Sequence, residues 1–444
     1  MKKIFHKWKE LALIIAVILA GLVFLAPIEI GARIVASIMV FVAVLWFTEA
    51  LPLWITALIV PVLLVVLARI KPVNAFAPFF DPIIALLLGG CVLGQAIQVH
   101  NFDKRIIEKL ISFFGKNSKI FLLGLMIVTA LISFWISNTA TAALMMPIGV
   151  AVLLASRLKP GSNYGRAVVL GVAYATTIGG LGTPVGTPPN LIAIRWLAEH
   201  GIHLSFLGWT IRALPLVVIM IPLAWFVLIT FYKPEIPVIK FAEKEKKPMS
   251  REQKTVFWVF AITVLLWLTE TLHGIHNSVI AMLPVITLFG LNLLGKKDLF
   301  KIEWDVLLLV GGGLSLGNAI VLTGLDKILA TGLAGVLGGQ SAFILFFVLA
   351  LFAVGFTAFV ANTGAAAILI PVMIPLASIL GVSPLAVGLV VGMVVSFDFI
   401  VPVGTPPNAM AYGTGYAKVI DMVKAGLLLS ILGSLAIELM AFLW

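Results

Sequence analysis

Two polar motifs recur in this chain inside long apolar stretches, and the first is a pair of consecutive prolines. The string Gly-Thr-Pro-Pro-Asn occurs at 186–190 and again at 404–408. Proline lacks an amide donor and clashes with the preceding helical turn, so a Pro-Pro pair at membrane depth leaves carbonyl groups without partners. Duplicated breaks of this kind are typical of secondary transporters, where the freed backbone groups meet solute and ions.

The second motif is a cluster of hydroxyl and amide side chains that precedes each break. It reads Ser-Asn-Thr at 137–139 and Ala-Asn-Thr at 361–363, and a hydroxyl residue, Ser133 or Thr357, stands five positions before each asparagine. A single Ser, Thr or Asn in a membrane helix usually bonds to a neighbouring helix. Duplication beside a broken helix favours a binding site instead.

These residue types suit two kinds of ligand. Hydroxyls, amides and helix N-termini donate hydrogen bonds to carboxylate oxygens, and the helix dipole favours negative charge there. The backbone and side-chain oxygens freed at the same breaks suit a small hard cation such as sodium. The motifs therefore predict an anion and a cation bound close together.

Composition indicates a membrane protein. Hydrophobic residues make up 61% of the chain and charged residues 11%, with a mean hydropathy of +1.17, whereas soluble domains carry roughly 25% charged residues. The net charge of +11 comes from short basic segments between apolar runs, which predicts cytoplasmic loops rather than nucleic-acid binding. The single cysteine, Cys91, excludes a disulfide within the chain, and no nucleotide-binding loop, metal-ligand spacing or nucleophile-and-base pair points to an enzyme or to a cofactor.

The remaining elements repeat as well, at an offset of about 220 residues. Gly89-Gly90 matches Gly312-Gly313, and Leu45-Trp46 matches Leu266-Trp267. We expect an all-α polytopic membrane protein with an extra N-terminal span (1–30), a first repeat (31–232), a solvated cytoplasmic linker (233–254) and a second repeat (255–444). Each repeat holds an odd number of crossings, whether its central segment crosses twice or dips in and returns, so the second repeat is inverted.

At these motifs the sequence resembles the divalent anion:sodium symporter (DASS) family, which takes up dicarboxylates, citrate or sulfate. The resemblance covers essentially the whole chain. It implies about 11 transmembrane helices, two re-entrant hairpins at 119–158 and 341–380, and a homodimer. It also implies scaffold spans at 31–118 and 255–340, and a transport part, 119–232 with 341–444, that moves as an elevator.

The resemblance further implies ligand sets. The substrate-binding residues would be Ser137, Asn138, Thr139, Thr187, Pro188, Asn362, Thr363, Thr405 and Pro406. Two sodium sites would use Ser133, Asn138 and Gly186, and Thr357, Val360, Asn362 and Gly404. Ala361 departs from the family's usual Ser-Asn-Thr and removes one hydroxyl from the second tip.

Asp398 has no carboxylate counterpart, because the first repeat carries Gly180 at the equivalent position. A carboxylate at the membrane centre is costly, about 2.5–3.5 kcal/mol, so it should face protein or water. Three roles are open at this point: a proton carrier, a group that attracts the second cation, or a structural acceptor nearly two turns from the break.

A sodium-coupled carrier of a small di- or tricarboxylate, such as a C4-dicarboxylate, is the leading hypothesis. We expect it in the cell inner (plasma) membrane, among lipid, with a cytoplasmic N-terminus, since lysine and arginine gather on that side. A sodium-independent exchanger, an anion channel and an intramembrane enzyme are the alternatives. Saturable, counterflow-capable uptake distinguishes a carrier from the last two.

Overall fold

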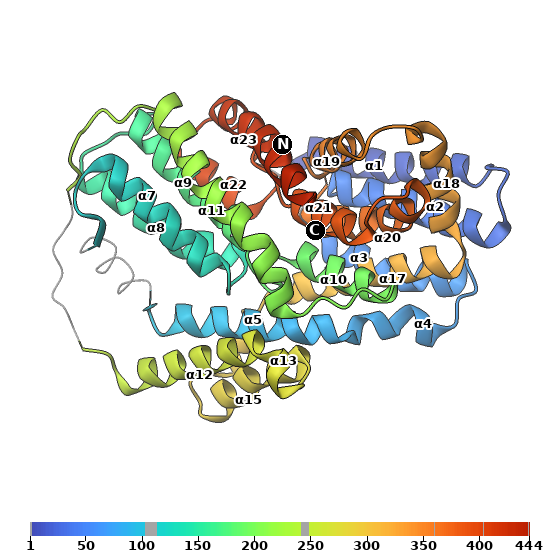
Figure 1. Cartoon of the computed structure of the whole chain (residues 1–444), viewed down its shortest axis with the longest axis horizontal. Coiled ribbons are helices and arrows are strands. Elements are labelled where there is room, and N and C mark those ends of the chain that lie inside the picture. The colour runs from blue at the N-terminus through green and yellow to red at the C-terminus, as the bar shows by residue number, and fades with distance from the viewer. Residues whose placement is uncertain (1, 103–112, 241–247, 359, 403, 443) are drawn as a thin grey trace.

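The computed structural model describes residues 2–102, 113–240, 248–358, 360–402, 404–442 and 444, and their regular structure is helical (Figure 1). The first half contains α1 Lys2–Val23, α2 Ile30–Thr48, α3 Leu53–Val66, α4 Pro72–Phe76, α5 Pro82–Val99, α7 Ser118–Ser133, α8 Asn138–Ala155, α9 Asn163–Gly180, α10 Pro188–Glu199 and α11 Phe206–Phe231. The second half contains α12 Arg251–Leu268, α13 Glu270–His273, α14 Asn277–Ile280, α15 Met282–Gly290, α16 Lys296–Leu299, α17 Trp304–Leu322, α18 Leu325–Leu337, α19 Ala342–Thr357, α20 Asn362–Leu380, α21 Pro384–Val394, α22 Pro406–Gly413 and α23 Val419–Ala441. The predicted all-α class is confirmed.

Seven stretches of the described chain are long and apolar enough to cross a membrane. They are Ile30–Thr48, Pro72–Val99, Asn138–Ala155, Phe206–Phe231, Trp304–Leu322, Asn362–Leu380 and Val419–Ala441. Several shorter helices, among them α7, α19 and α21, are also apolar. The count of 11 spans and the extra N-terminal span at 1–30 stay predictions.

Glycines allow helices of the two repeats to pack against each other in matching pairs. Helix α5 packs on α14 and α15, and α17 packs on α3. A Cβ on Gly89 would lie 2.6 Å from the carbonyl oxygen of Ala281, and a Cβ on Gly312 would lie 2.5 Å from that of Ala57. Each repeated glycine is therefore required by a close backbone approach. As a result, α5 of the first repeat packs on α14 and α15 of the second, and α17 of the second repeat packs on α3 of the first.

Each polar cluster lies at the turn of a helical hairpin. Helices α7 and α8 are joined by 134–137, and α19 and α20 by 358–361. Asn138 and Asn362 are each the first residue of the returning helix. The hairpins are thus present at the expected places, and their re-entrant course through a membrane remains a prediction.

Each Pro-Pro pair begins the second half of a broken helix. The break between α9 and α10 covers 181–187, and the break between α21 and α22 covers 395–405. Pro188 and Pro406 occupy the first helical position, where a missing amide costs nothing. Each second half-helix packs on the other repeat: α10 lies against α20 and α21, and α22 lies against α8 and α9.

The start of the linker is exposed at most positions, as expected, but its backbone is anchored. Lys240 N donates to Ser156 Oγ at 2.9 Å, and Ile239, only 1% exposed, donates to the Lys116 carbonyl at 2.9 Å. Backbone bonds from 237–240 therefore hold this segment to both ends of the first hairpin, at 116–118 and at Ser156. Residues 241–247 lie outside the described chain, and 248–250 lead into α12.

Candidate functional site: a pocket between two hairpin tips

A pocket of about 440 Å³ lies where the two hairpin turns and the two helix breaks meet. All nine residues expected to contact substrate line it: Ser137, Asn138, Thr139, Thr187, Pro188, Asn362, Thr363, Thr405 and Pro406. Residues from positions more than 200 apart in the chain thus meet at one place. Their role as ligands stays a prediction.

Four helix N-termini surround the pocket, those of α8, α10, α20 and α22. Ser137 caps its helix by accepting from Ala140 N at 3.2 Å. Ala361 makes no such bond, so the first-turn amides of α20 have no side-chain cap, whereas α10 and α22 each begin with two prolines and contribute a dipole end without amides at those positions. Free amides and four positive dipole ends favour an anion in the space between them.

The first predicted sodium ligands form a buried cluster of oxygens behind the first tip. The Ser133 hydroxyl lies 2.9 Å from Asn138 Oδ1 and 2.8 Å from the Thr176 carbonyl oxygen. Gly186 approaches the same place, because a Cβ built on it would lie 2.9 Å from the Ser133 carbonyl oxygen. Ser133, Asn138 and Gly186 are therefore adjacent, and their neutral oxygens suit a small hard cation.

The second predicted set is arranged in the same way. The Thr357 hydroxyl lies 2.8 Å from Asn362 Oδ1, 3.4 Å from the Val360 carbonyl oxygen and 2.7 Å from that of Val395. Thr357 is fully buried, and Gly404 lines the pocket with Asn362. Both clusters fit a sodium ion in the chemistry of their donors.

The asparagine that ends each proline motif secures the break. Asn190 Nδ2 donates to the carbonyls of Gly180 at 2.9 Å and Thr183 at 2.8 Å. Asn408 Nδ2 donates to those of Asp398 at 2.9 Å and Val401 at 3.0 Å, in the same register. These amides satisfy carbonyls that the broken helix frees. The repeated Gly-Thr-Pro-Pro-Asn string signalled the position but not this role.

Asp398 lies within the second break and not two turns from it. Helix α21 ends at Val394, so residues 395–405 form the interruption. The corresponding helix α9 continues to Gly180. The expectation was wrong because the second break begins earlier than the first, and no proline or glycine at Val395 marks that start.

Two scaffold carboxylates also line the pocket, Glu303 and Asp305. Glu303 precedes α17, and its Oε1 accepts from the Ser137 hydroxyl at 2.7 Å. A second contact between the two parts joins Asp81, the N-cap of α5, to Arg195 of α10 at 3.2 Å. Sequence reasoning missed these residues, because nothing local to 303–305 indicates that this helix end faces the hairpin tip.

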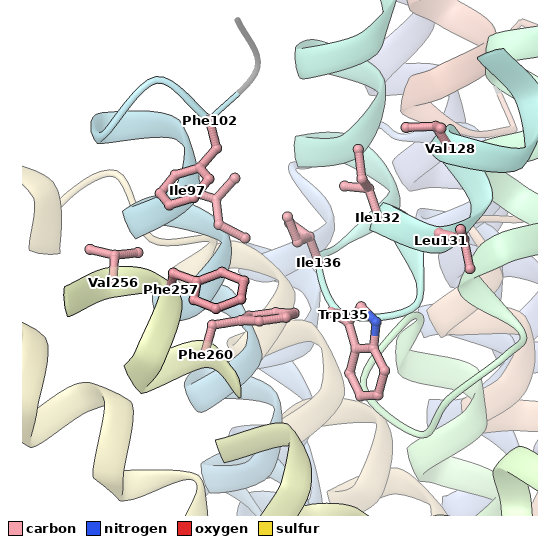
Figure 2. Close-up of a pocket in the computed structure, with 10 residues that line it drawn as sticks. All are labelled: Ile97, Phe102, Val128, Leu131, Ile132, Trp135, Ile136, Val256, Phe257 and Phe260. Carbon is pink, nitrogen blue, oxygen red and sulfur yellow. The ribbon is translucent and has the colours of Figure 1, made fainter. Parts of the chain in front are cut away.

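A separate pocket of about 290 Å³ lies between α5, α7 and α12 (Figure 2). Its lining residues are apolar, including Leu131, Trp135 and Phe260, and their side chains point toward one another across the gap. These side chains carry no charge, and the Trp135 indole is the one hydrogen-bond donor among them, so they would not hold a dicarboxylate.

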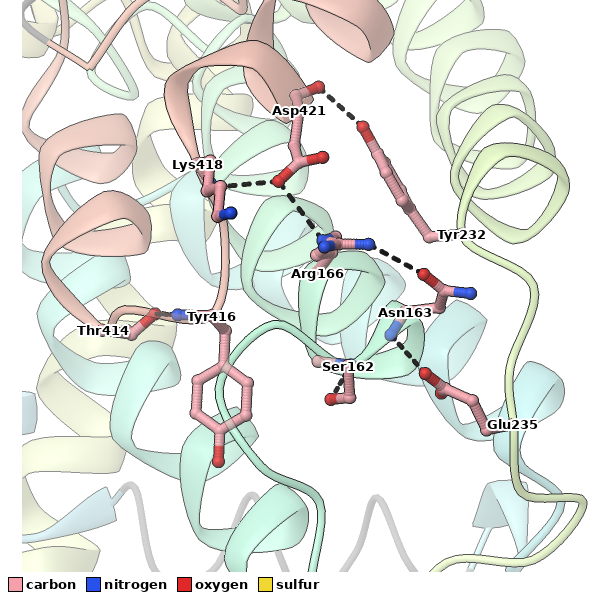
Figure 3. A network of polar contacts seen from close by, with 10 residues as sticks. Ser162, Asn163, Arg166, Tyr232, Glu235, Thr414, Tyr416, Lys418 and Asp421 are labelled. Atoms are coloured by element: carbon pink, nitrogen blue, oxygen red, sulfur yellow. Dashed lines mark hydrogen bonds and ion pairs between the residues drawn. The ribbon is translucent and has the colours of Figure 1, made fainter.

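A polar network joins the N-termini of α9 and α23 to the residues that follow α11 (Figure 3). Arg166 pairs with Asp421 at 3.3 Å, Tyr232 donates to the Asp421 carbonyl at 2.7 Å, and Glu235 accepts from the Asn163 amide. Burial, with Asp421 nearby, raises the pKa of Tyr232 to about 12, so the phenol stays neutral and remains a donor. The network anchors Tyr232 and Glu235 to the start of α9 and to α23, and none of its residues lines the hairpin pocket.

A family model described as the sodium:sulfate symporter transmembrane region matches residues 6–444. An uncharacterized transporter of Haemophilus influenzae is 33% identical over 433 residues, which cover 94% of this chain and 93% of that protein. The sodium-dependent dicarboxylate transporter SdcS of Staphylococcus saprophyticus is 31% identical over 442 residues, which cover 92% of this chain and 85% of SdcS.

Two solved structures share the fold at low identity. The YdaH transporter of Alcanivorax borkumensis aligns with a TM-score of 0.62 at 18% identity, over 84% of this chain and 86% of its own. MtrF of Neisseria gonorrhoeae aligns with a TM-score of 0.59 at 13% identity, over 84% and 82%. Both share the helical architecture of this chain.

Proposed function

Because this chain belongs to the divalent anion:sodium symporter family, whose model spans residues 6–444, we propose that it moves a C4-dicarboxylate such as succinate, malate or fumarate across the membrane together with sodium. It is a multi-pass membrane transporter and not an enzyme, and sodium serves as coupling ion without a further cofactor. A relative named as a sodium-dependent dicarboxylate transporter supports the substrate class.

The observation that carries the proposal is the convergence of four helix N-termini on one pocket. Among the described residues that line it, none is lysine or arginine. An anion would therefore be held by amides, hydroxyls and helix dipoles. These neutral groups bind carboxylate oxygens, and no basic side chain adds a permanent positive charge to the pocket. Two tips on opposite sides of the pocket suit a solute with a carboxylate at each end.

The two oxygen clusters behind the tips support sodium coupling. Asn138 and Asn362 belong both to a cluster and to the pocket lining. A cation bound behind either asparagine would fix that side chain and place positive charge beside the substrate carboxylate. Binding of the two ions is then mutually favourable.

An elevator movement is the proposed route across the membrane. The tips and breaks belong to the transport part, whereas Glu303, Asp81 and Glu270 belong to the scaffold and contact it at Ser137, at Arg195 and at the Phe206 amide. Few polar contacts must break for the parts to slide. Family membership supports a homodimeric scaffold in the inner (plasma) membrane, with the N-terminus in the cytoplasm and lipid around the apolar surface.

Thermal denaturation of the purified protein tests the substrate assignment. Succinate, malate, fumarate, citrate and sulfate are each added in sodium chloride and in choline chloride. We expect dicarboxylates to raise the melting temperature in sodium and to do so weakly in choline. Failure of all five anions in both salts would refute the substrate class, and equal stabilisation in both salts would favour the sodium-independent exchanger.

A further inference from the structure

The second oxygen cluster differs from the first by one carboxylate, that of Asp398. The repeats keep register through this region, since Asn408 bonds to the Asp398 carbonyl as Asn190 bonds to that of Gly180. A Cβ built on Gly180 would meet Asn138 Oδ1, so this position adjoins the cluster asparagine. In the second repeat the equivalent position is Asp398, which carries a carboxylate where Gly180 has only a hydrogen.

The Asp398 carboxylate points at Gly404, a predicted ligand residue of the second cluster. A Cβ built on Gly404 would coincide with Asp398 Oδ2. Asp398 is 1% exposed, and neither of its carboxylate oxygens has a hydrogen-bond partner among the described residues. A structural acceptor would need donors at this place, and the Ile400 amide, which approaches the carboxylate, is not in hydrogen-bond geometry among the described residues.

A buried carboxylate without a partner is strongly unfavourable, so the group takes up a proton unless an ion or a donor stabilises its charge. The second cluster, to which Gly404 is assigned, consists of oxygens: the Thr357 hydroxyl with the Asn362 amide oxygen, and the Val360 and Val395 carbonyls. Oxygens repel a carboxylate unless a cation lies between them. One carboxylate with several neutral oxygens matches a hard monovalent ion.

We propose that Asp398 is an anionic ligand of the second sodium site, so that the two sodium sites of this chain differ in charge. The inference rests on the proposed sodium coupling and deepens it. The first site is built from neutral oxygens alone, whereas the second carries its own counter-charge. The second site is therefore occupied at lower sodium concentration, before the anion arrives.

Sodium-dependent stabilisation without substrate tests this assignment. Melting temperature is measured against sodium concentration at constant ionic strength in choline chloride, for the wild type, Asp398→Asn and Asp398→Gly. The Gly variant carries the residue of the first repeat. The matched control is Glu438→Gln, which alters another fully buried carboxylate with no partner among the described residues, on α23 and outside the pocket lining.

We expect both Asp398 variants to raise the sodium concentration at half-maximal stabilisation at least tenfold, and the control to leave it unchanged. A value for Asp398→Asn within twofold of the wild type overturns the inference while leaving sodium coupling intact. A wild type with no stabilisation by sodium over choline overturns both.

The unmodified protein gives a second measurement that requires no variant to fold. Dicyclohexylcarbodiimide modifies buried carboxyl groups, and the labelled positions are read by peptide mass spectrometry. Sodium, but not choline, should protect Asp398 and leave the labelling of Glu438 unchanged. Equal labelling of Asp398 in the two salts overturns the inference.

Discussion

Asn138 is predicted to contact both proposed ligands, the sodium ion and the substrate anion. Its amide oxygen lies 2.9 Å from the Ser133 hydroxyl, and the residue lines the anion pocket. Replacing Asn138 or Thr139 by alanine should weaken dicarboxylate binding by about 1.5–3 kcal/mol, the usual worth of a bond to a charged group. Calorimetric titration measures the loss.

The control for this prediction is Thr129→Val on the same hairpin. The Thr129 hydroxyl donates within α7 to the Leu125 carbonyl, away from the pocket. Affinity in this variant should match the wild type. Undiminished binding in Asn138→Ala would show that the first tip does not hold the substrate.

Glu303 opposes the anion in the pocket. Its Oε1 accepts a hydrogen bond from the Ser137 hydroxyl at 2.7 Å. The hydroxyl has one proton, so Ser137 cannot donate to the substrate while it donates to Glu303. Two charges several ångströms apart repel by about 2 kcal/mol at the effective dielectric of a protein site. Glu303→Gln should therefore bind dicarboxylate at least fivefold more tightly in the same titration, while Glu252→Gln, at an exposed site on α12, should not change affinity. Weaker binding in Glu303→Gln would show that the carboxylate assists the anion.

Among individual residues, the sequence predicted those that belong to local motifs. The hydroxyl and amide residues recur with fixed spacing beside a proline break, so their meeting could be expected. Glu303 could not be found in that way, because its approach to Ser137 depends on how α17 packs against the first hairpin. The position of Asp398 was misjudged because helix α21 ends without a local signal at Val394.

Among the elements, α5 and α17 depend on glycines that admit the opposite repeat. Gly89→Ala would place a methyl group 2.6 Å from the Ala281 carbonyl oxygen, whereas at the adjacent Gly90 the nearest atom, Val185 Cβ, is 3.4 Å away. Overpacking of this kind costs about 1–3 kcal/mol. We expect Gly89→Ala to lower the melting temperature clearly and Gly90→Ala to change it little. Equal melting temperatures would argue against close packing of α5 on α14 and α15.

Helix breaks were the most predictable elements, since a Pro-Pro pair can only begin a helix. The exchange of α10 and α22 between the repeats was not predictable from the sequence, because each is a short apolar segment that could pack on either side. The prediction of a solvated linker rested on its many charged residues. Its first residues proved to be held by backbone bonds to 116–118, which no composition reveals.

Transport should require that the transport part can move relative to the scaffold. A Cβ on Gly90 lies 3.4 Å from Val185 Cβ, close to the roughly 3.5–4.5 Å spacing of a disulfide. Gly90→Cys with Val185→Cys, in a Cys91→Ser background, should cross-link scaffold to transport part on oxidation. Uptake should stop and return with reductant.

A matched cross-link within the scaffold is the control for this experiment. Gly31→Cys with Thr323→Cys joins α2 to the end of α17, where the corresponding separation is 4.0 Å. Oxidation of this pair should leave uptake intact. Full transport by the oxidised Gly90–Val185 pair would contradict an elevator movement.

Sodium-driven uptake of labelled succinate into proteoliposomes tests the central claim most directly. We expect saturable accumulation under an inward sodium gradient, little uptake in choline, and no requirement for internal dicarboxylate. Uptake that is equal in sodium and choline, and that depends on internal dicarboxylate, would contradict symport and establish exchange.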